Sequence, residues 1–167
     1  CSLTYNGVPN DNISGLDHLE GETVQIVADG AVQTDKVVTG GAITLDAEAS
    51  KVHIGYHYNS DLQLMRFDAG SANGTALGKV RRTHLMGIML HRSLNMKFGM
   101  SFENMLTLTF RADPDITNAP TPLFTGIKSE EIEADSDMDN FISIRQDQPF
   151  PLTILAIMPQ MKTQDNI

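Results

Sequence analysis

The chain has 167 residues, 41% of them apolar, which is enough to build one domain, or one domain with a smaller lobe, around a substantial core. Its formal net charge of −9 argues against a general nucleic-acid clamp, because phosphate binding needs clustered Lys and Arg. A single cysteine cannot form an internal disulfide, so nothing marks an oxidising compartment. No window approaches the about 18 apolar residues of a membrane-spanning helix, and no secretory signal is visible.

The chain begins with Cys1 and not with Met, which allows two interpretations. It is either a fragment, cut by processing or by design, or a mature lipoprotein whose Cys1 carries lipid. We favour the fragment, because Ser2-Leu3-Thr4-Tyr5 has the composition of a strand and not of a flexible tether.

Short alternating segments dominate the first half of the chain. The expected strands are residues 23–29, 36–39, 42–45 and 51–58. Asp29-Gly30 and Gly40-Gly41 offer tight turns between them, because both pairs tolerate the positive φ angles that such turns need. Several short strands separated by glycine turns predict a small β-barrel lobe over residues 14–67.

The second half contains a further series of expected strands. Residues 68–78 are mostly small and are typical of a connection between lobes. The expected strands after them are residues 79–92, 106–110, 123–126, 141–145 and 152–158. The last is an apolar run with Pro on both sides, which indicates a buried strand. We therefore predict an all-β protein, in which residues 1–13 and 76–167 form an antiparallel, β-sandwich-like lobe.

Charge is unevenly distributed in this second half. No Asp or Glu occurs between Ala69 and Phe102, where all the charged side chains are basic: Lys79, Arg81, Arg82, Arg92 and Lys97. Six acidic residues follow between Glu130 and Asp139. Complementary segments of this kind are typical of neighbouring strands or of two sides of a subunit contact. A basic strand that touches DNA is the alternative, which the overall acidity disfavours.

Two patterns suggest metal ligands, and neither is complete. Asp135-Ser136-Asp137-Met138-Asp139 opens like a calcium loop, but Asn140 replaces the turn glycine and Gln146 replaces the bidentate glutamate. His53 and His57 share one face of an expected strand with Cα atoms about 13 Å apart, too far to hold one metal ion without further elements. His18, His84 and His91 suggest no ligand set. We interpret the acidic loop as solvated and all five histidines as satisfied or exposed surface residues.

No nucleophile or catalytic motif is visible. Cys1 has no evident activating base beside it, and Gly78-Lys79 does not complete a phosphate-binding loop. We therefore expect no enzyme activity, no cofactor, and no catalytic, cofactor-binding or metal-binding residue. Five methionines cluster in the middle of the chain: Met86, Met89, Met96, Met100 and Met105. Most should fill the core, while some could line an adaptable contact surface.

Several blocks, in the same order along the chain, resemble a family of bacteriophage and prophage tail proteins, described as phage stabilisation or tail nozzle-like proteins. The blocks are Ile13–Val24 with Ala28-Asp29-Gly30, Gly41–Leu45, Ala49–Gly55, Tyr58–Leu62, Gly74–Lys79, Pro122–Gly126 and Gln146–Pro159. The resemblance covers about Tyr5 to Pro159. Members of this family are usually several times longer, so the chain would correspond to a C-terminal portion.

The resemblance implies a structural virion component of the nozzle or hub type, made in the bacterial cytoplasm and built into a phage tail. It implies a homo-oligomeric ring with adjacent tail proteins as partners, and DNA passing through non-specifically. An acidic wall suits such a conduit, because like charge prevents sticking. The alternatives are a host-surface or ligand-binding β module, and a surface lipoprotein anchored through Cys1. Low aromatic content, 6% with no Trp, weighs against sugar stacking.

Overall fold

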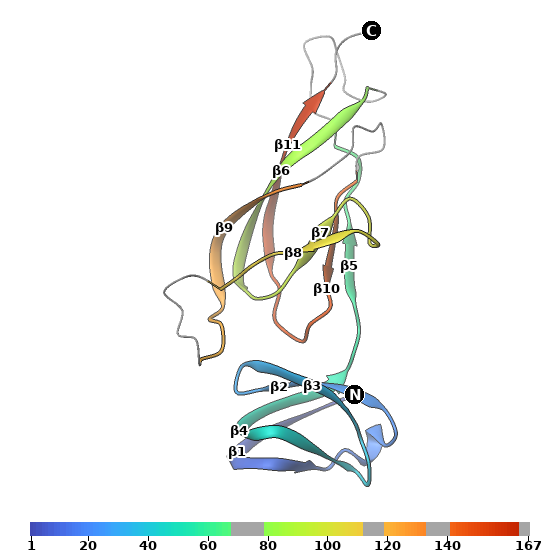
Figure 1. Ribbon diagram of the computed structural model, residues 1–167, viewed down its shortest axis with the longest axis vertical. Coiled ribbons are helices and arrows are strands. Elements are labelled where there is room, and N and C mark those ends of the chain that lie inside the picture. Colours follow the sequence, from blue (N-terminus) through green and yellow to red (C-terminus); the bar gives the residue numbers. More distant parts are fainter. Residues whose placement is uncertain (68–78, 112–118, 133–140, 164–167) are drawn as a thin grey trace. The chain divides into compact units, whose positions relative to one another are not determined.

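A computed structural model describes residues 1–67, 79–111, 119–132 and 141–163. These residues are almost entirely β-structure, so the all-β prediction is confirmed (Figure 1). The elements are β1 (Ser2–Ser14), the 3₁₀ turn η1 (Asp17–Leu19), β2 (Thr23–Ala28), β3 (Ala31–Val37), β4 (Ala42–Tyr56), β5 (Ser60–Gln63), β6 (Arg81–Ser93), β7 (Lys97–Gly99), β8 (Met105–Thr107), β9 (Phe124–Glu131), β10 (Ser143–Gln146) and β11 (Ile154–Thr163). They form three antiparallel sheets in two compact units.

The first unit contains residues 1–59, 111–122 and 147–149 and holds one four-stranded sheet, in the order β1-β4-β2-β3. Val24, Ile26 and Ala28 on β2 lie in its core, as their alternation predicts. Val52 and Ile54 on β4 join them, but Tyr56, expected on the same face, is 41% exposed.

Glycine-containing turns set the hairpins of this unit. β2 and β3 are joined by Asp29-Gly30, with φ angles of 46° and 87°. Gly40 and Gly41, with φ angles of 62° and 68°, form a similar turn inside the isolated bridge between Thr39 and Ala42. Positive φ at both central residues matches the twist of the flanking strands, which is why these turns close hairpins.

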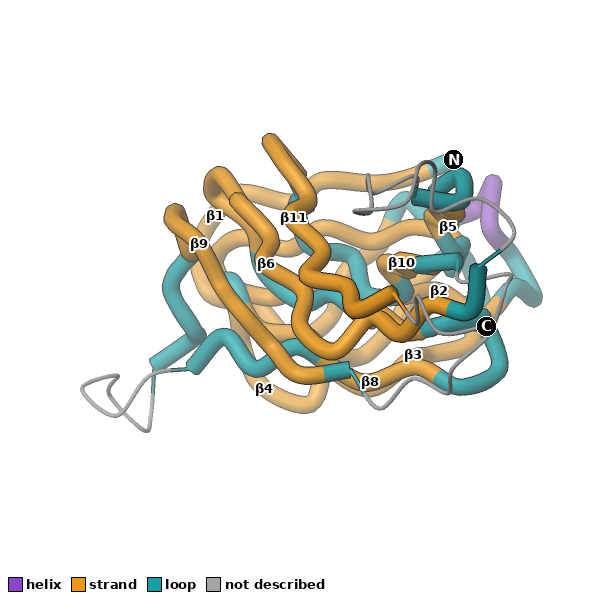
Figure 2. Tube along the Cα trace, turned by 90° about the horizontal axis from the view of Figure 1, so that it is seen from above, coloured by secondary structure: helices purple, strands orange, loops and turns teal. Residues whose placement is uncertain are grey.

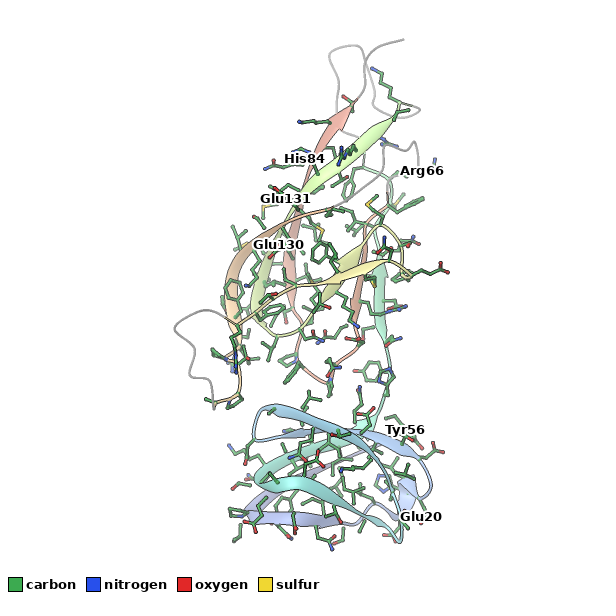
Figure 3. The ribbon with its side chains drawn as sticks, viewed as in Figure 1. Glu20, Tyr56, Arg66, His84, Glu130 and Glu131 are labelled. Carbon is green, nitrogen blue, oxygen red and sulfur yellow. The ribbon has the colours of Figure 1, made fainter. Side chains whose placement is uncertain are left out.

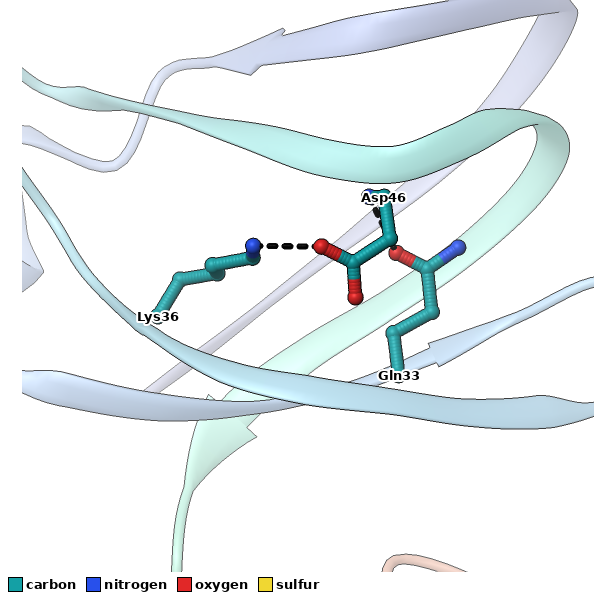
Figure 4. A network of polar contacts seen from close by, with 3 residues as sticks. All are labelled: Gln33, Lys36 and Asp46. Carbon is teal, nitrogen blue, oxygen red and sulfur yellow. Dashed lines mark hydrogen bonds and ion pairs between the residues drawn. The ribbon is translucent and has the colours of Figure 1, made fainter.

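The expected barrel does not close: among the described residues, the sheet has two open edges, β1 and β3. The long strand β4 pairs with β1 on one side over most of its length. On its other side, β2 pairs only with Val52–Tyr56. Along the first half of β4, side chains make the contacts with β3. The Lys36 ammonium donates a hydrogen bond to the Asp46 carboxylate, and the backbone N–H of Asp46 donates one to the side-chain oxygen of Gln33 (Figure 4).

The second unit contains residues 60–110, 123–146 and 150–167 and holds the other two sheets, β5-β10-β7-β8 and β11-β6-β9. One apolar cluster receives side chains from both sheets. Phe98 (β7) and Ile144 (β10) come from one sheet, and Met86 and Ile88 (β6) come from the other. Two sheets that share one core are the arrangement of a β-sandwich.

Two segments pair differently from the sequence-based expectation. Residues 2–6 pair with residues 51–55 of β4, so β1 belongs to the first unit and not to the sandwich-like lobe. β5, placed by the sequence in the small lobe, pairs with β10 in the second unit. Strand patterns locate strands along the chain, but their pairing depends on contacts between residues that are far apart in sequence.

Candidate interaction surface

The sheet β11-β6-β9 has one covered face and one exposed face. Met86, Ile88 and Leu90 of β6 point inward and are at most 1% exposed. Because successive side chains alternate across a strand and paired residues share a face, the residues between them and their partners lie on the other side. We call that side the outer face. β11, β6 and β9 run side by side across it (Figure 2).

The outer face is ordered in rows across the three strands. One row is Ala156–Met89–Ile127, the next is Met158–Gly87–Ser129, and the third is Gln160–Leu85–Glu131. Beyond the third row, Lys162 pairs with Arg82. The rows therefore run from apolar at one end to charged at the other.

The centre of this face is apolar and open to solvent. Four large side chains form this apolar centre, with exposed fractions of 40–58%: Met89, Ile127, Leu155 and Met158. Leu155 is exposed because the register with β6 shifts between Ile154 and Ala156. Met158 lies across Gly87, since a Cβ at Gly87 would sit 3.4 Å from the Met158 Cε. An apolar cluster of this kind on a sheet face is typical of a contact site.

Opposite charges lie on opposite edge strands at the charged end. Glu130 and Glu131, both exposed, end β9 (Figure 3). Lys162 is exposed on the other edge strand, β11, and Arg82 is exposed on the central strand, β6. Within the described residues, no ion pair joins these acidic and basic side chains. The sequence left two interpretations of the basic and acidic segments: neighbouring segments, or two sides of a subunit contact. The pairing of β6 with β9 brings the described parts of the two segments side by side.

The inner side of β9 is held firmly. Lys128 points inward beside Ile88, and its Nζ lies 5.0 Å from the ring centre of Phe124 and 5.5 Å from that of Phe110. The same Nζ donates a hydrogen bond to the carbonyl oxygen of Thr109. The cation–π contacts and this hydrogen bond attach β9 to the residues beneath the sheet.

A second fixed polar contact lies on the other sheet of this unit. The Arg145 guanidinium donates two hydrogen bonds of 2.7 Å to the two carboxylate oxygens of Asp61, which links β10 to β5. The hydrogen bonds and the nearby positive charge lower the pKa of Asp61 below its usual 3.8. Arg145 also lies 5.0 Å from the ring centre of Phe102. This bidentate pair is a structural clamp on a short strand.

The residues that the sequence raised as metal or catalytic candidates are not gathered together. Within the ranges described, no three His, Cys, Asp or Glu side chains lie close enough to hold a metal ion. His53 Nδ1 is 3.1 Å from the Thr4 hydroxyl, which is a strand-to-strand contact. Cys1 is a free, exposed thiol. The calcium-like residues Asp135–Asp139 lie outside the described residues.

The methionines divide between the two roles that the sequence left open. Met86 and Met96 are fully buried in the core, and Met100 packs against it. Met89 is 40% exposed in the apolar centre. The outer face was not predicted from the sequence, because the whole apolar run at residues 152–158 was expected to lie in the interior. Apolar residues in both phases of the alternation show that both faces of the strand are apolar, and only the pairing with β6 shows which of them is exposed.

Comparison with models of known protein families and with curated proteins found no match to this chain. Among the residues described, no helix is long and apolar enough to cross a membrane. Function is therefore inferred from the sheet surface and from the sequence blocks given above.

Proposed function

We propose that the chain is a structural component of a phage or prophage tail, of the nozzle or hub type, which acts by self-assembly and not by catalysis. Its partners are further copies of itself, arranged in a ring, and adjacent tail proteins, within a virion assembled in the bacterial cytoplasm. Two observations support the proposal: the ordered sequence blocks between Tyr5 and Pro159, and the rigid, all-β units in which one sheet presents an apolar surface.

The single observation that carries the assembly role is the apolar centre of the outer face. Ile127 and Leu155 are more than half exposed, on two strands that flank a well-packed central strand. Burial of such side chains at about 25 cal/mol per Å² drives association without any chemistry. A face of this composition on a firmly hydrogen-bonded sheet suits a protein whose task is to fit its neighbours.

The net charge of −9 fits the proposed passage of DNA. A wall of the same sign as the phosphate backbone repels the genome and does not retain it. Non-specific passage requires no base contacts, so this part of the proposal assigns no DNA-reading residue.

A host-surface or ligand-binding β module is the second candidate function, because two aromatic side chains are exposed close together in the sequence. Tyr56 is 41% exposed and Tyr58 is 73% exposed, at the end of β4 and just beyond it. Exposed tyrosines are common in recognition surfaces. Binding of purified chain to bacterial surfaces that Tyr58→Ala abolishes would favour this candidate.

The test of the tail role is the location of the protein in particles. The reading frame that encodes the chain would be tagged in its host, phage production induced, and particles purified by density gradient. Mass spectrometry should find the product in intact particles in a constant ratio to other tail proteins. Deletion of the frame should leave particles without complete tails in the electron microscope. Complete, infectious particles that lack the product would contradict the proposal.

A further inference from the structure

We propose that the outer face of the β11-β6-β9 sheet is the contact between two copies of this chain, related by a two-fold axis that runs parallel to β6. The inference deepens the proposed function by naming the surface of self-association, and it rests on that function for the identity of the occupant as a second copy. It follows from how apolar and charged side chains are arranged in the rows of this face.

The first step is the apolar fit. A two-fold axis over β6 and parallel to it keeps each row at its own level and exchanges the two edge strands. Met89 then lies against Met89 of the second copy, while Ile127 lies against Ala156 and the neighbouring Leu155. Two sheets packed in this way interdigitate their side chains at a separation of about 10 Å. The flexible thioethers of Met89 and Met158 can fill the remaining gaps.

The second step is the charge fit. The same axis brings the β9 edge of each copy, with Glu131, over the β11 edge of the other. Glu131 then faces Gln160, and Lys162 is two residues further along the strand, at about 7 Å. Two long side chains can bridge that distance. The contact therefore forms two equivalent ion pairs, Glu131 with Lys162 in each direction.

The third step is the choice of occupant. A two-fold contact is self-complementary, so opposite charges on opposite sides of the axis and apolar residues close to the axis favour it. On the outer face, the acidic Glu131 lies on β9, the basic Lys162 lies on β11, and Met89 lies on β6 between them. Arg82, which is also on β6, lies at the charged end of the axis opposite Arg82 of the second copy, between the two ion pairs. Charge complementarity of this kind sets orientation and register more than affinity.

The decisive experiment is charge reversal with rescue, measured by sedimentation velocity on the purified 167-residue chain. We expect a dimer at high micromolar concentration. Lys162→Glu and Glu131→Lys should each weaken it about tenfold, since each places like charges across the contact. The double variant E131K/K162E should restore most of the wild-type affinity. Because E131K reduces the net negative charge, its weakening of the dimer cannot come from overall repulsion.

Two matched controls accompany these variants. Glu48→Lys makes the same charge change at an exposed position on β4, outside this face, and should leave the dimer unchanged. Ile127→Asp in the apolar centre should weaken dimerisation by more than about tenfold, while Val8→Asp, at a 79% exposed apolar residue of β1, should not. Circular dichroism and thermal unfolding would show that every variant is folded.

Three results would overturn the inference: a wild-type chain that stays monomeric, a dimer unaffected by the single reversals, or single reversals that the double variant does not rescue. If the double variant does not restore the dimer, Glu131 and Lys162 belong to the contact but are not paired across a two-fold axis. The result of this dimerisation experiment is independent of the result of the particle experiment that tests the tail role. A dimeric chain absent from particles would contradict the proposed function alone, and a monomeric chain found in particles would contradict this inference alone.

Discussion

Glu20 is the residue that best shows how one exposed side chain fixes a local structure. Its two carboxylate oxygens accept hydrogen bonds from the backbone N–H groups of Gly40 and Gly41, at 2.8 and 2.7 Å. These two hydrogen bonds lower the pKa of Glu20 below its usual 4.5, and the one from Gly41 has the larger effect. Glu20 thus closes the turn before β4 from a segment twenty residues earlier.

The sign of this shift predicts a pH-dependent effect of Glu20→Gln. A carboxyl whose pKa is lowered by folding adds stability above its unfolded pKa and loses that stability as pH falls through its folded pKa. Glutamine offers one acceptor and turns an N–H₂ group toward the turn, so the variant should be less stable at pH 7. The difference between the melting temperatures of variant and wild type should shrink steadily below about pH 4.5.

Glu22→Gln is the matched control for that comparison, because Glu22 is an exposed glutamate of the same segment. Its melting temperature should follow that of the wild type at every pH. A constant difference between Glu20→Gln and wild type from pH 7 down to pH 3 would show that the carboxylate charge is not what holds the turn.

At the scale of the element, β6 is the strand on which core and surface are most clearly separated. Met86 and Met89 have the same chemistry and lie on one strand, yet Met86 is fully buried and Met89 is 40% exposed. Met86→Ala should lower the free energy of unfolding by about 2–5 kcal/mol, because it removes buried methylene groups and leaves a cavity. Met89→Ala should change it by less than about 1 kcal/mol.

Denaturant unfolding would measure both values, and sedimentation would show the reverse ranking for self-association. Met89→Ala should weaken the dimer, while Met86→Ala should leave it intact under conditions in which the variant is folded. Equal destabilisation by the two substitutions would mean that the outer face is covered within a single chain.

Among the individual elements, the sequence predicted those strands and turns whose signals lie within a few residues of one another along the chain. β2 was predicted from its alternation, the turn after it from Asp29-Gly30, and β6 from its length. β3, at Ala31–Val37, overlaps the strand expected at residues 36–39 only at its end. β5 and β7, with four and three residues, are too short to show a pattern. β4 was expected as two strands, because Asp46 and Glu48 interrupt the apolar alternation where one edge of the strand has no backbone partner.

The outer face escaped prediction for a related reason. The run Leu152–Met158 is apolar in both phases of the alternation, which on its own indicates a strand buried on both faces. In the structure, Ile157 packs inward while Leu155 and Met158 are exposed. An interface residue and a core residue are chemically alike, so the sequence cannot separate them without the pairing.

At the scale of the whole molecule, symmetry limits what this contact can build. A two-fold contact between identical faces joins copies in pairs and then stops. A ring therefore needs a second contact of the head-to-tail type, on another surface of the chain. The outer face and the ring are thus separate elements of the proposed assembly, and each can be tested without the other.

The net charge of −9 on each copy predicts how the pair responds to salt. Repulsion between two such copies acts over the whole molecule, and the Debye length falls from about 30 Å at 0.01 M salt to about 8 Å at 0.15 M. The Glu131–Lys162 pairs act over about 4 Å, well inside both lengths. Added salt over this range should therefore screen the repulsion first and tighten the dimer in sedimentation.

The double variant E131K/K162E keeps the wild-type net charge, so it should show the same salt response. E131K alone carries less negative charge and should respond less steeply. A dimer that weakens steadily from 0.01 to about 0.15 M salt would mean that the ion pairs outweigh the net charge. In that case the apolar centre, with Met89 on the axis, would contribute less to the contact than its exposure indicates.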